Sequence, residues 1–252
     1  PYERLDFFRS CSTDQPASDI EPLDPALIIY TSGTTGKPKG AVLTQENLVR
    51  DAENIIETWE ITCADILCHS LPLFHIHGLS FALHTCLASG ATVRMLDQFN
   101  TGTVVHQLSS KTKSTRCTMY MAVPAMYSLL MRDIGDESSD FSHLRLITSG
   151  SAPLPVKDFK RITEIFRQDP VEREGMSETG MNFSNPLRGV KKPGSIGLPL
   201  PGLKVRVTDP ETFIDAEPGQ TGEFWLKSSA ITPGYWLKPE ETKKTFEQGW
   251  FR

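Results

Sequence analysis

The sequence predicts an α/β fold in which helices flank a mostly parallel β-sheet, with a small antiparallel β subdomain near the end of the chain. Two patterns support this prediction. Between residues 26 and 167, short apolar runs alternate with helix-length segments, as they do in successive βαβ units. After about residue 190, Pro and Gly become frequent, and runs of alternating apolar and polar residues follow one another with no helix between them.

The individual elements can be placed in order along the chain. The helix at residues 45–59 has the clearest start, because Thr44 before it is an N-cap candidate. Apolar runs predict strands of the main sheet at residues 26–31, 66–70, 91–96, 117–122 and 144–148. The segments between and after them predict helices at residues 79–88, 103–110, 125–133 and 156–167. The antiparallel subdomain is expected to contain strands at residues 203–208 and 222–227.

These patterns divide the chain into three expected parts. Residues 1–25 are turn-rich and lack periodicity, so they are expected to form a linker or lead-in segment. Residues 26–190 form the α/β core, and residues 191–252 form the small β subdomain. The chain starts without a methionine and stops without a polar tail, so we expect it to be a piece cut from a longer protein.

Composition narrows the classes of function. The 252 residues are 38% hydrophobic and 23% charged with a net charge of −5, so no basic excess indicates nucleic acid as a partner. The apolar runs are as short as strands, far below the roughly 20 residues of a membrane span. The five cysteines form no CxxC pair for zinc or redox chemistry, which favours free thiols in a reducing, intracellular compartment.

A loop rich in hydroxyl, glycine and lysine residues follows the first expected strand, at residues 31–40, and reads TSGTTGKPKG. Glycines let backbone amides approach anionic oxygens, and hydroxyls and lysines add donors and positive charge, which suits a polyphosphate. It is not a Walker A loop, because proline follows the first lysine. The alternative is a flexible surface hairpin. The candidate phosphate-binding residues are Thr31, Ser32, Gly33, Thr34, Thr35, Gly36, Lys37 and Lys39.

This loop resembles the signature of the adenylate-forming superfamily, which includes acyl-CoA synthetases, peptide-synthetase adenylation domains and luciferases. Four further blocks match that family in its own order: LPLFHIHG at 71–78, SGSAPL at 149–154, GMSET at 175–179 and GSIG at 194–197. The resemblance implies the large AMP-binding domain of the superfamily, a carboxylic acid substrate, and ATP, Mg²⁺ and CoA as cofactors. No nucleic acid partner and no membrane span are expected.

Two of the matched blocks are expected to bind the nucleotide. Ser149, Gly150 and Ser151 follow an expected strand, where α/β folds bind ligands, and the resemblance implies contacts to adenine; a simple turn is the alternative. In the next block the Ser177 hydroxyl would bind the α-phosphate, and the Glu178 carboxylate would hold Mg²⁺. Together with Lys39 they form the expected catalytic set. A solvated Ser-Glu pair is the alternative for that block.

One departure from the family pattern lies beside this block. Most relatives carry an aromatic residue that stacks on adenine immediately before the glycine, whereas this chain has Glu174, which cannot stack. Glu174, Gly175 and Met176 are nevertheless expected in the nucleotide site. The consequence for nucleotide affinity is left open.

Residues for the acid substrate come from the LPLFHIHG block and from a basic cluster. The resemblance implies that His75, Ile76 and His77 line the acyl site; a pair of structural histidines is the alternative. The nearest branch is that of malonyl-CoA synthetases, including the animal mitochondrial type, which share MYMAVP at 119–124 and MNFSNP at 181–186. The second carboxylate of malonate needs a cation, and Arg188 with a bidentate fork, Lys191 and Lys192 are the candidates, with no choice among them.

The resemblance implies a reaction in two halves: the acid attacks the α-phosphate of ATP to give an acyl-AMP, and the CoA thiol then displaces AMP. The family's ribose-binding Thr-Gly-Asp, hinge and small domain with a catalytic lysine come later than residue 252, so we expect this piece alone to be inactive and to need the remainder of its chain. The alternatives are a medium-chain or aryl acyl-CoA synthetase and a non-catalytic nucleotide-binding module, which Glu174 favours. The resemblance implies the mitochondrial matrix, with the cytoplasm as the alternative.

Overall fold

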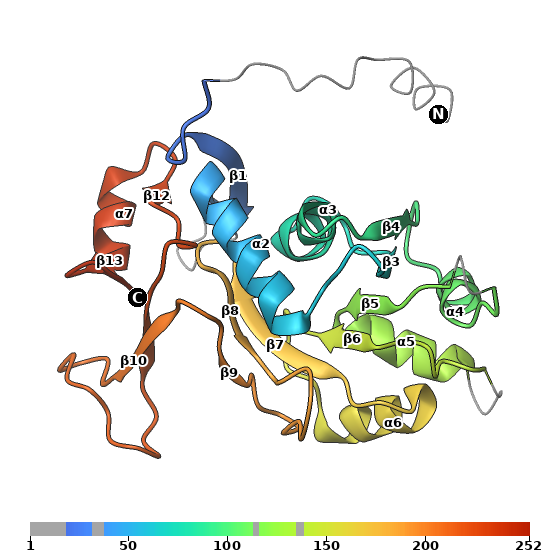
Figure 1. Ribbon diagram of the computed structural model, residues 1–252. Coiled ribbons are helices and arrows are strands. Elements are labelled where there is room, and N and C mark those ends of the chain that lie inside the picture. The colour runs from blue at the N-terminus through green and yellow to red at the C-terminus, as the bar shows by residue number, and fades with distance from the viewer. Residues whose placement is uncertain (1–18, 32–37, 113–115, 135–138) are drawn as a thin grey trace.

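The fold is built on a seven-stranded sheet with the strand order β4-β3-β5-β6-β7-β8-β9. The structure is a computed structural model that describes residues 19–31, 38–112, 116–134 and 139–252. Strands β4 to β7 run parallel, and the β7–β8 hairpin and β9 add antiparallel strands at one edge (Figure 1). The strands are β3 (Ile66–His69), β4 (Thr92–Met95), β5 (Met119–Ala122), β6 (Leu146–Ser149), β7 (Val171–Met176), β8 (Gly180–Ser184) and β9 (Leu198–Pro199).

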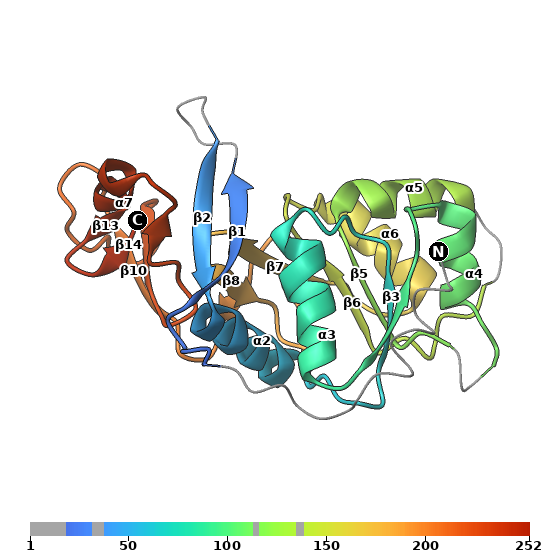
Figure 2. The same cartoon turned by 90° about the horizontal axis from the view of Figure 1, so that it is seen from above.

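Helices cover both faces of this sheet, as the view from above shows (Figure 2). One face carries α2 (Gln45–Trp59), the π-helix η1 (His77–His84) and its continuation α3 (Thr85–Ala88). The other carries α5 (Pro124–Ile134) and α6 (Val156–Phe166), with α4 (Thr101–Leu108) beside α5. Apolar side chains of the sheet and both helix layers form one core, which includes the fully buried Trp59, Tyr120 and Tyr127.

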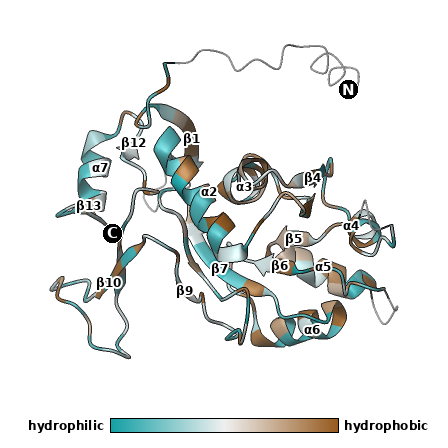
Figure 3. Ribbon diagram, in the orientation of Figure 1, coloured by the Kyte–Doolittle hydropathy of each residue, from teal (hydrophilic) through white to brown (hydrophobic). Residues whose placement is uncertain are grey.

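Two smaller antiparallel sheets flank the main sheet. The three-stranded sheet contains β1 (Pro25–Thr31), β2 (Lys39–Thr44) and β12 (Gly234–Tyr235), in the order β1-β2-β12. The four-stranded sheet has the order β10-β11-β14-β13. Its strands are β10 (Lys204–Thr208), β11 (Glu223–Lys227), β13 (Phe246–Glu247) and β14 (Trp250–Phe251). The helix α7 (Pro239–Thr245) directly precedes β13 in the chain and is hydrophilic along its length (Figure 3).

The predicted fold class is confirmed: helices flank a mostly parallel sheet, and an antiparallel subdomain follows. The predicted helix at 45–59 is confirmed with its cap, since Thr44 and Asn47 exchange hydrogen bonds between side chain and backbone in a capping box. The expected boundary at residue 190 stays a prediction. β9 and β12, which follow residue 190, pair with β8 and β2, which precede it.

Two features of the main sheet were predicted wrongly. The strand at 26–31 was expected to open the parallel sheet, but β1 forms an antiparallel hairpin with β2, a strand that was not predicted. The β7–β8 hairpin was also not predicted. Its first strand carries the charged residues Glu172, Arg173 and Glu174, so it lacks the apolar run typical of a buried strand.

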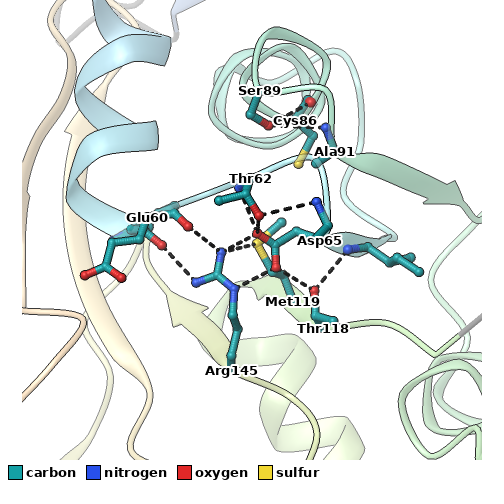
Figure 4. Close-up of polar contacts among 12 residues, drawn as sticks. Glu60, Thr62, Asp65, Cys86, Ser89, Ala91, Thr118, Met119 and Arg145 are labelled. Atoms are coloured by element: carbon teal, nitrogen blue, oxygen red, sulfur yellow. Dashed lines mark hydrogen bonds and ion pairs between the residues drawn. The ribbon is translucent and has the colours of Figure 1, made fainter. Parts of the chain in front are cut away.

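An ion-pair cluster ties α2 to the amino ends of the parallel strands (Figure 4). Arg145, just before β6, contacts Asp65 through Nε–Oδ1 and Nη2–Oδ2 distances of 2.6 Å each. The same guanidinium donates to the carbonyls of Trp59 and Glu60 at the end of α2, at 2.9 and 3.1 Å. Thr118, before β5, donates to Asp65 Oδ1 at 2.8 Å. The cluster therefore fixes the edge of the sheet from which the strands start.

Two further findings bear on the expectations from composition. No helix in the described parts of the chain combines the length and apolar character needed to cross a bilayer. The four cysteines among the described residues are free thiols, of which Cys63 is exposed and Cys68, Cys86 and Cys117 are buried.

Candidate functional site

Arg173 is a charged side chain buried inside the fold. Only 4% of the residue is exposed, and its guanidinium carbon lies 5.1 Å from the centre of the Phe81 ring. Nη2 lies 3.5 Å from Ser151 Oγ, whereas Nε and Nη1 have no hydrogen-bond partner among the described residues. Burial lowers the pKa of Arg173 to about 10, against the charges of Glu174 and Asp51, so the guanidinium remains protonated at neutral pH. A buried cation with unused donors is a candidate anion-binding group.

The loop that follows β6 is shaped around this guanidinium. A Cβ atom on Gly150 would lie 2.5 Å from Arg173 Nε, so a larger residue would displace the guanidinium. Ser151 has a φ of +66°, a left-handed conformation that side chains adopt at some cost. This turn places the Ser151 hydroxyl within reach of both Arg173 and His77.

His77 lies at the start of η1 and faces the same hydroxyl. Its Nδ1 is 3.3 Å from Ser151 Oγ, and its Nε2 is buried without a partner among the described residues. Burial, followed by the charge of Arg173, holds the pKa of His77 well below its usual range. The ring is therefore neutral at pH 7. His75 is exposed, and its Nδ1 accepts a hydrogen bond of 3.2 Å from the His77 backbone, so it supports the turn into η1.

A cavity of about 380 Å³ opens beside Arg173. It lies at the carboxyl ends of β6 and β7, the edge of a parallel sheet at which α/β folds bind ligands. Its wall is partly apolar and partly polar, and it is lined by Ser149, Ser151, Ala152, Pro153, Leu154, Glu172, Arg173, Glu174, Gly175, Gly194, Ser195 and Ile196.

A second cavity, of about 430 Å³, lies on the other side of Glu174 and contains Lys39, Met176 and Glu178. Ser177 and Glu178 occupy the turn between β7 and β8. Glu178 Oε1 accepts a hydrogen bond of 2.9 Å from the Tyr235 hydroxyl. Lys39 Nζ lies 2.9 Å from Glu241 Oε2. This cavity therefore contains one predicted cation and one predicted metal-binding carboxylate.

Glu174 separates the two cavities, since it lines both. Its Oε2 accepts a hydrogen bond of 3.1 Å from Asn182 Nδ2, on the adjacent strand β8. Burial raises the pKa of Glu174, and the Asn182 hydrogen bond and the Arg173 charge oppose that rise. Gly175 follows at a bulge in β7, where a Cβ atom would lie 2.6 Å from the Gly180 carbonyl oxygen.

The sequence-predicted residues thus fall into three groups. The structure brings together Lys39, Glu178, His77, Met176 and the residues of the two strand ends, namely Ser149, Gly150, Ser151, Glu174 and Gly175. Thr31 ends β1, with its hydroxyl 3.4 Å from the Lys39 carbonyl oxygen. Ser32, Gly33, Thr34, Thr35, Gly36 and Lys37 lie outside the described residues, and their role stays a prediction.

Two predicted substrate residues lie elsewhere. Ile76 is 2% exposed within the main core and is not among the residues that line the cavity beside Arg173. Arg188 lies at the surface with 80% of its side chain exposed, and its Nε donates to Glu60 Oε1 at 2.9 Å. That ion pair uses the bidentate fork that was expected to meet the substrate.

Arg173 and Tyr235 were not predicted as site residues. Arg173 stands between two carboxylates in the sequence, so it has the appearance of a surface charge. It is buried because β7 lies between β6 and β8 inside the sheet, where its neighbour Glu172 is buried as well. Tyr235 is separated from Glu178 by 57 positions in the chain, and no local pattern indicates that contact.

The match to a family model decides the family. The model described as AMP-binding enzyme matches residues 2–236, which is most of the chain. The chain belongs to the AMP-binding enzyme family. The predicted superfamily is therefore confirmed, and the two cavities lie in an AMP-binding domain.

Individual relatives within the AMP-binding family agree with the predicted branch. A mitochondrial malonate–CoA ligase of Mus musculus is 38% identical over 95% of this chain and 46% of its own length. A malonate–CoA ligase of Arabidopsis thaliana is 36% identical over 91% of this chain and 40% of its own. The crystal structure of ATP-bound MatB from Rhodopseudomonas palustris matches with a TM-score of 0.87 and 35% identity, over 98% of this chain and 48% of that one. The chain thus spans about half the length of the curated relatives it matches.

Proposed function

We propose that the chain is the nucleotide- and acid-binding part of an AMP-forming acid–CoA ligase whose acid is malonate. The ligase would join the acid to the α-phosphate of ATP and then transfer the acyl group to CoA. The mouse and Arabidopsis relatives named malonate–CoA ligases support the choice of acid. The structural observation that supports malonate most directly is the buried guanidinium of Arg173 with its unused donors.

A dicarboxylate matches this guanidinium. One carboxylate of malonate must react, and the other must be buried close to it, which costs several kcal/mol without a paired cation. Arg173 Nε and Nη1 are unused donors on a planar guanidinium, which suits a carboxylate, and Ser151 and His77 offer further polar atoms beside it. Arg173 therefore replaces Arg188, Lys191 and Lys192 as the proposed partner of the second carboxylate.

The same arrangement disfavours acids with an apolar tail. An alkyl or aryl group in this position would leave Arg173 buried and unpaired, and sites built to hydrogen-bond a substrate group reject analogues that lack it by large factors. His77 adds no second positive charge, because its pKa is well below 7 and its ring is neutral. It is instead a hydrogen-bonding group that reaches the hydroxyl of Ser151, which lines the pocket. Arg173 is therefore the cation of the acid site that would meet the carboxylate that does not react, beside Glu172 and Glu174 on the same cavity wall.

The second cavity fits the phosphates of ATP. Lys39 supplies positive charge there, and the predicted phosphate loop at 32–37 lies directly before it in the chain. Among the described residues no group of three or more His, Cys, Asp or Glu could enclose a metal ion. The single carboxylate of Glu178 would be enough for Mg²⁺, which reaches proteins through one or two carboxylates together with substrate phosphates. When bound there, Mg²⁺ would neutralise phosphate charge.

The chain's own residues would act by binding and orienting rather than by covalent chemistry. Arg173 would hold the distal carboxylate so that the other one points toward the phosphate cavity beyond Glu174. Lys39 would stabilise charge that develops on the phosphoryl group. Ser177, in the β7–β8 turn, is proposed to donate its hydroxyl to the same group.

An acid panel tests this proposal. ATP–pyrophosphate exchange would be measured on the full-length protein with malonate, oxalate, propanoate, octanoate and an aryl acetate. Exchange that depends on malonate and is at least about tenfold weaker with each monocarboxylate supports the proposal. Exchange with octanoate or the aryl acid instead would indicate a medium-chain or aryl synthetase. Nucleotide binding with no exchange for any acid would indicate a non-catalytic module, the alternative that Glu174 favours.

Two further properties are proposed for the full-length protein: a need for the remaining chain in catalysis and a location in mitochondria. The ligase reaction is proposed to need the portion of chain that the relatives have and this sequence does not, so residues 1–252 alone should bind nucleotide without forming malonyl-CoA. The mitochondrial matrix is proposed as the location because the mouse relative is described as mitochondrial. Imaging of the tagged full-length protein against a matrix marker tests the second point.

A further inference from the structure

A segment near the C-terminal end of the described chain packs against both the β1–β2 hairpin and the β7–β8 turn. Residues 229–242, here called the bracing segment, include β12 and the start of α7. β12 pairs with β2, with Tyr235 opposite Ala41 and Gly234 opposite Val42. The Trp236 backbone donates to the Gly40 carbonyl at 2.8 Å. Figures 1 and 2 show α7 and its neighbours on the outer side of the β1–β2 hairpin. The bracing segment is thus the outer strand of the sheet from which Lys39 projects.

The bracing segment also holds both the backbone and the side chain of Glu178. The Thr232 backbone donates to the Glu178 carbonyl at 2.7 Å, and the Tyr235 hydroxyl donates to Glu178 Oε1 at 2.9 Å. Asn47 on α2 anchors the segment by donating to the carbonyls of Ser229 and Ile231, at 2.8 and 2.9 Å. The turn that bears Glu178 is therefore fixed from a part of the chain more than fifty positions away.

Tyr235 contacts both predicted catalytic groups of the phosphate cavity. Lys39 Nζ lies 5.2 Å from the centre of the Tyr235 ring, a cation–π distance, while the hydroxyl of the same ring binds Glu178. The Tyr235 backbone donates to Thr242 Oγ1 at 2.9 Å, which fixes the residue on α7 as well. The one side chain therefore contacts both the Lys39 cation and the Glu178 carboxylate.

We propose that Tyr235 is a positioning residue that orients the Glu178 carboxylate toward the metal-bound nucleotide. Its hydroxyl donates to Oε1, and no hydrogen bond from the described residues engages Oε2, so Oε2 would be the oxygen left to bind a metal ion. Hydrogen bonds to the far oxygen of a metal-binding carboxylate fix its rotamer, and their loss typically costs 10- to 100-fold in metal affinity or activity. This inference rests on the proposed function, since it concerns the nucleotide site of that reaction.

The test replaces Tyr235 by Phe in the full-length protein, which removes the hydroxyl and keeps the ring over Lys39. Binding of ATP is measured by calorimetry with and without Mg²⁺, in the absence of any acid. The variant should bind Mg²⁺–ATP at least about tenfold more weakly, with binding of metal-free ATP and the melting temperature unchanged. Trp236→Phe, a conservative change at the next and partly exposed residue, is the matched control and should leave both affinities unchanged.

A double-mutant cycle separates positioning from a structural role. In a Glu178→Gln background, Tyr235→Phe should have no further effect on Mg²⁺–ATP affinity, because the carboxylate that it orients is gone. Equal Mg²⁺–ATP affinity in wild type and Tyr235→Phe would overturn the proposal, as would an effect of the same size in both backgrounds. The readout needs no acid, so it stands even if malonate proves not to be the substrate.

Discussion

Arg145 holds the Asp65 carboxylate through two parallel hydrogen bonds at the edge of the sheet opposite the Arg173 cavity. Asp65 has only 4% of its side chain exposed, whereas Arg145 retains 32%. Burial alone would raise the pKa of Asp65, but hydrogen bonds from Arg145, Thr62 and Thr118 outweigh it, and the pKa is lowered. The pair therefore contributes to folding and lies too far from the strand ends to act on a ligand.

Replacing Arg145 by Met should destabilise the fold without changing nucleotide binding. Without Arg145 the Asp65 carboxylate would keep only its hydrogen bonds from Thr62 and Thr118, and because Arg145 is itself partly exposed the cost should be about 1 to 3 kcal/mol. Urea denaturation and ATP calorimetry on the same sample measure the two properties. Arg132→Met, which removes an exposed ion pair with Asp133, is the control and should change the urea midpoint little. A urea midpoint that is the same for Arg145→Met and wild type would contradict this role.

Asp51 should make the protein less stable as the pH rises. It is fully buried on α2, where its Oδ1 accepts a hydrogen bond of 2.8 Å from the Met181 backbone, and burial raises its pKa to about 7. Between pH 3.8 and about 7 the folded state retains a proton that the unfolded chain has lost, so the free energy of unfolding falls across that window. Asp51→Asn keeps the acceptor and should flatten that part of the pH–stability profile. Parallel profiles for the two proteins would show that another group titrates.

Local sequence patterns predicted those helices and strands whose residues show a clear periodicity or a capping residue. The helix at 45–59 has a strong periodicity and a cap in Thr44, and the structure has both. The β1–β2 hairpin was missed because the apolar run at 26–31 also fits a buried parallel strand, and periodicity cannot distinguish the two. Pairing of β12 with β2 depends on residues far apart in the chain, for which a single sequence contains no signal.

The residues of the candidate site likewise divide into those that a local sequence block predicts and those that only the folded chain reveals. Lys39, Ser151 and Glu178 belong to short blocks that a reader recognises from residue order alone. Arg173 was overlooked because its burial depends on the place of β7 between β6 and β8 in the sheet, which the charged sequence of this segment does not indicate. Arg188 was one of three basic candidates for the second carboxylate, but Glu60, from the end of α2, pairs with it in the folded chain.

Glu178→Gln should impair Mg²⁺-dependent adenylation while leaving the fold intact. The amide keeps the size and can still accept from Tyr235, but it lacks the charge that Mg²⁺ requires. Initial rates of malonate-dependent ATP–pyrophosphate exchange, measured across a range of Mg²⁺ concentrations, test the prediction together with a melting curve. A wild-type rate and Mg²⁺ dependence in the variant would mean that Glu178 is only a turn residue.

Glu174→Tyr should tighten ATP binding by supplying an aromatic face between the two cavities. Asn182 would keep a partner, because it also donates to Thr179 Oγ1 at 2.8 Å. A base–aromatic stack is worth roughly 1 to 3 kcal/mol, which corresponds to an affinity gain of about 5- to 150-fold. ATP calorimetry on the full-length protein measures it, with Glu174→Gln to separate stacking from loss of charge. Equal or weaker binding by a folded Tyr variant would place adenine elsewhere.

The role of Arg173 in acid recognition is tested most directly by a change of substrate specificity. Malonate- and propanoate-dependent ATP–pyrophosphate exchange would be compared in full-length wild type, Arg173→Met and Arg173→Lys. Methionine removes the buried charge but keeps a long side chain, so malonate-dependent exchange should fall by about 100-fold or more, while exchange with propanoate should hold or rise. Lysine retains the charge without the planar fork and should be intermediate for malonate. If Arg173→Met folds and the ratio of the malonate rate to the propanoate rate is the same as in wild type, Arg173 does not bind the second carboxylate.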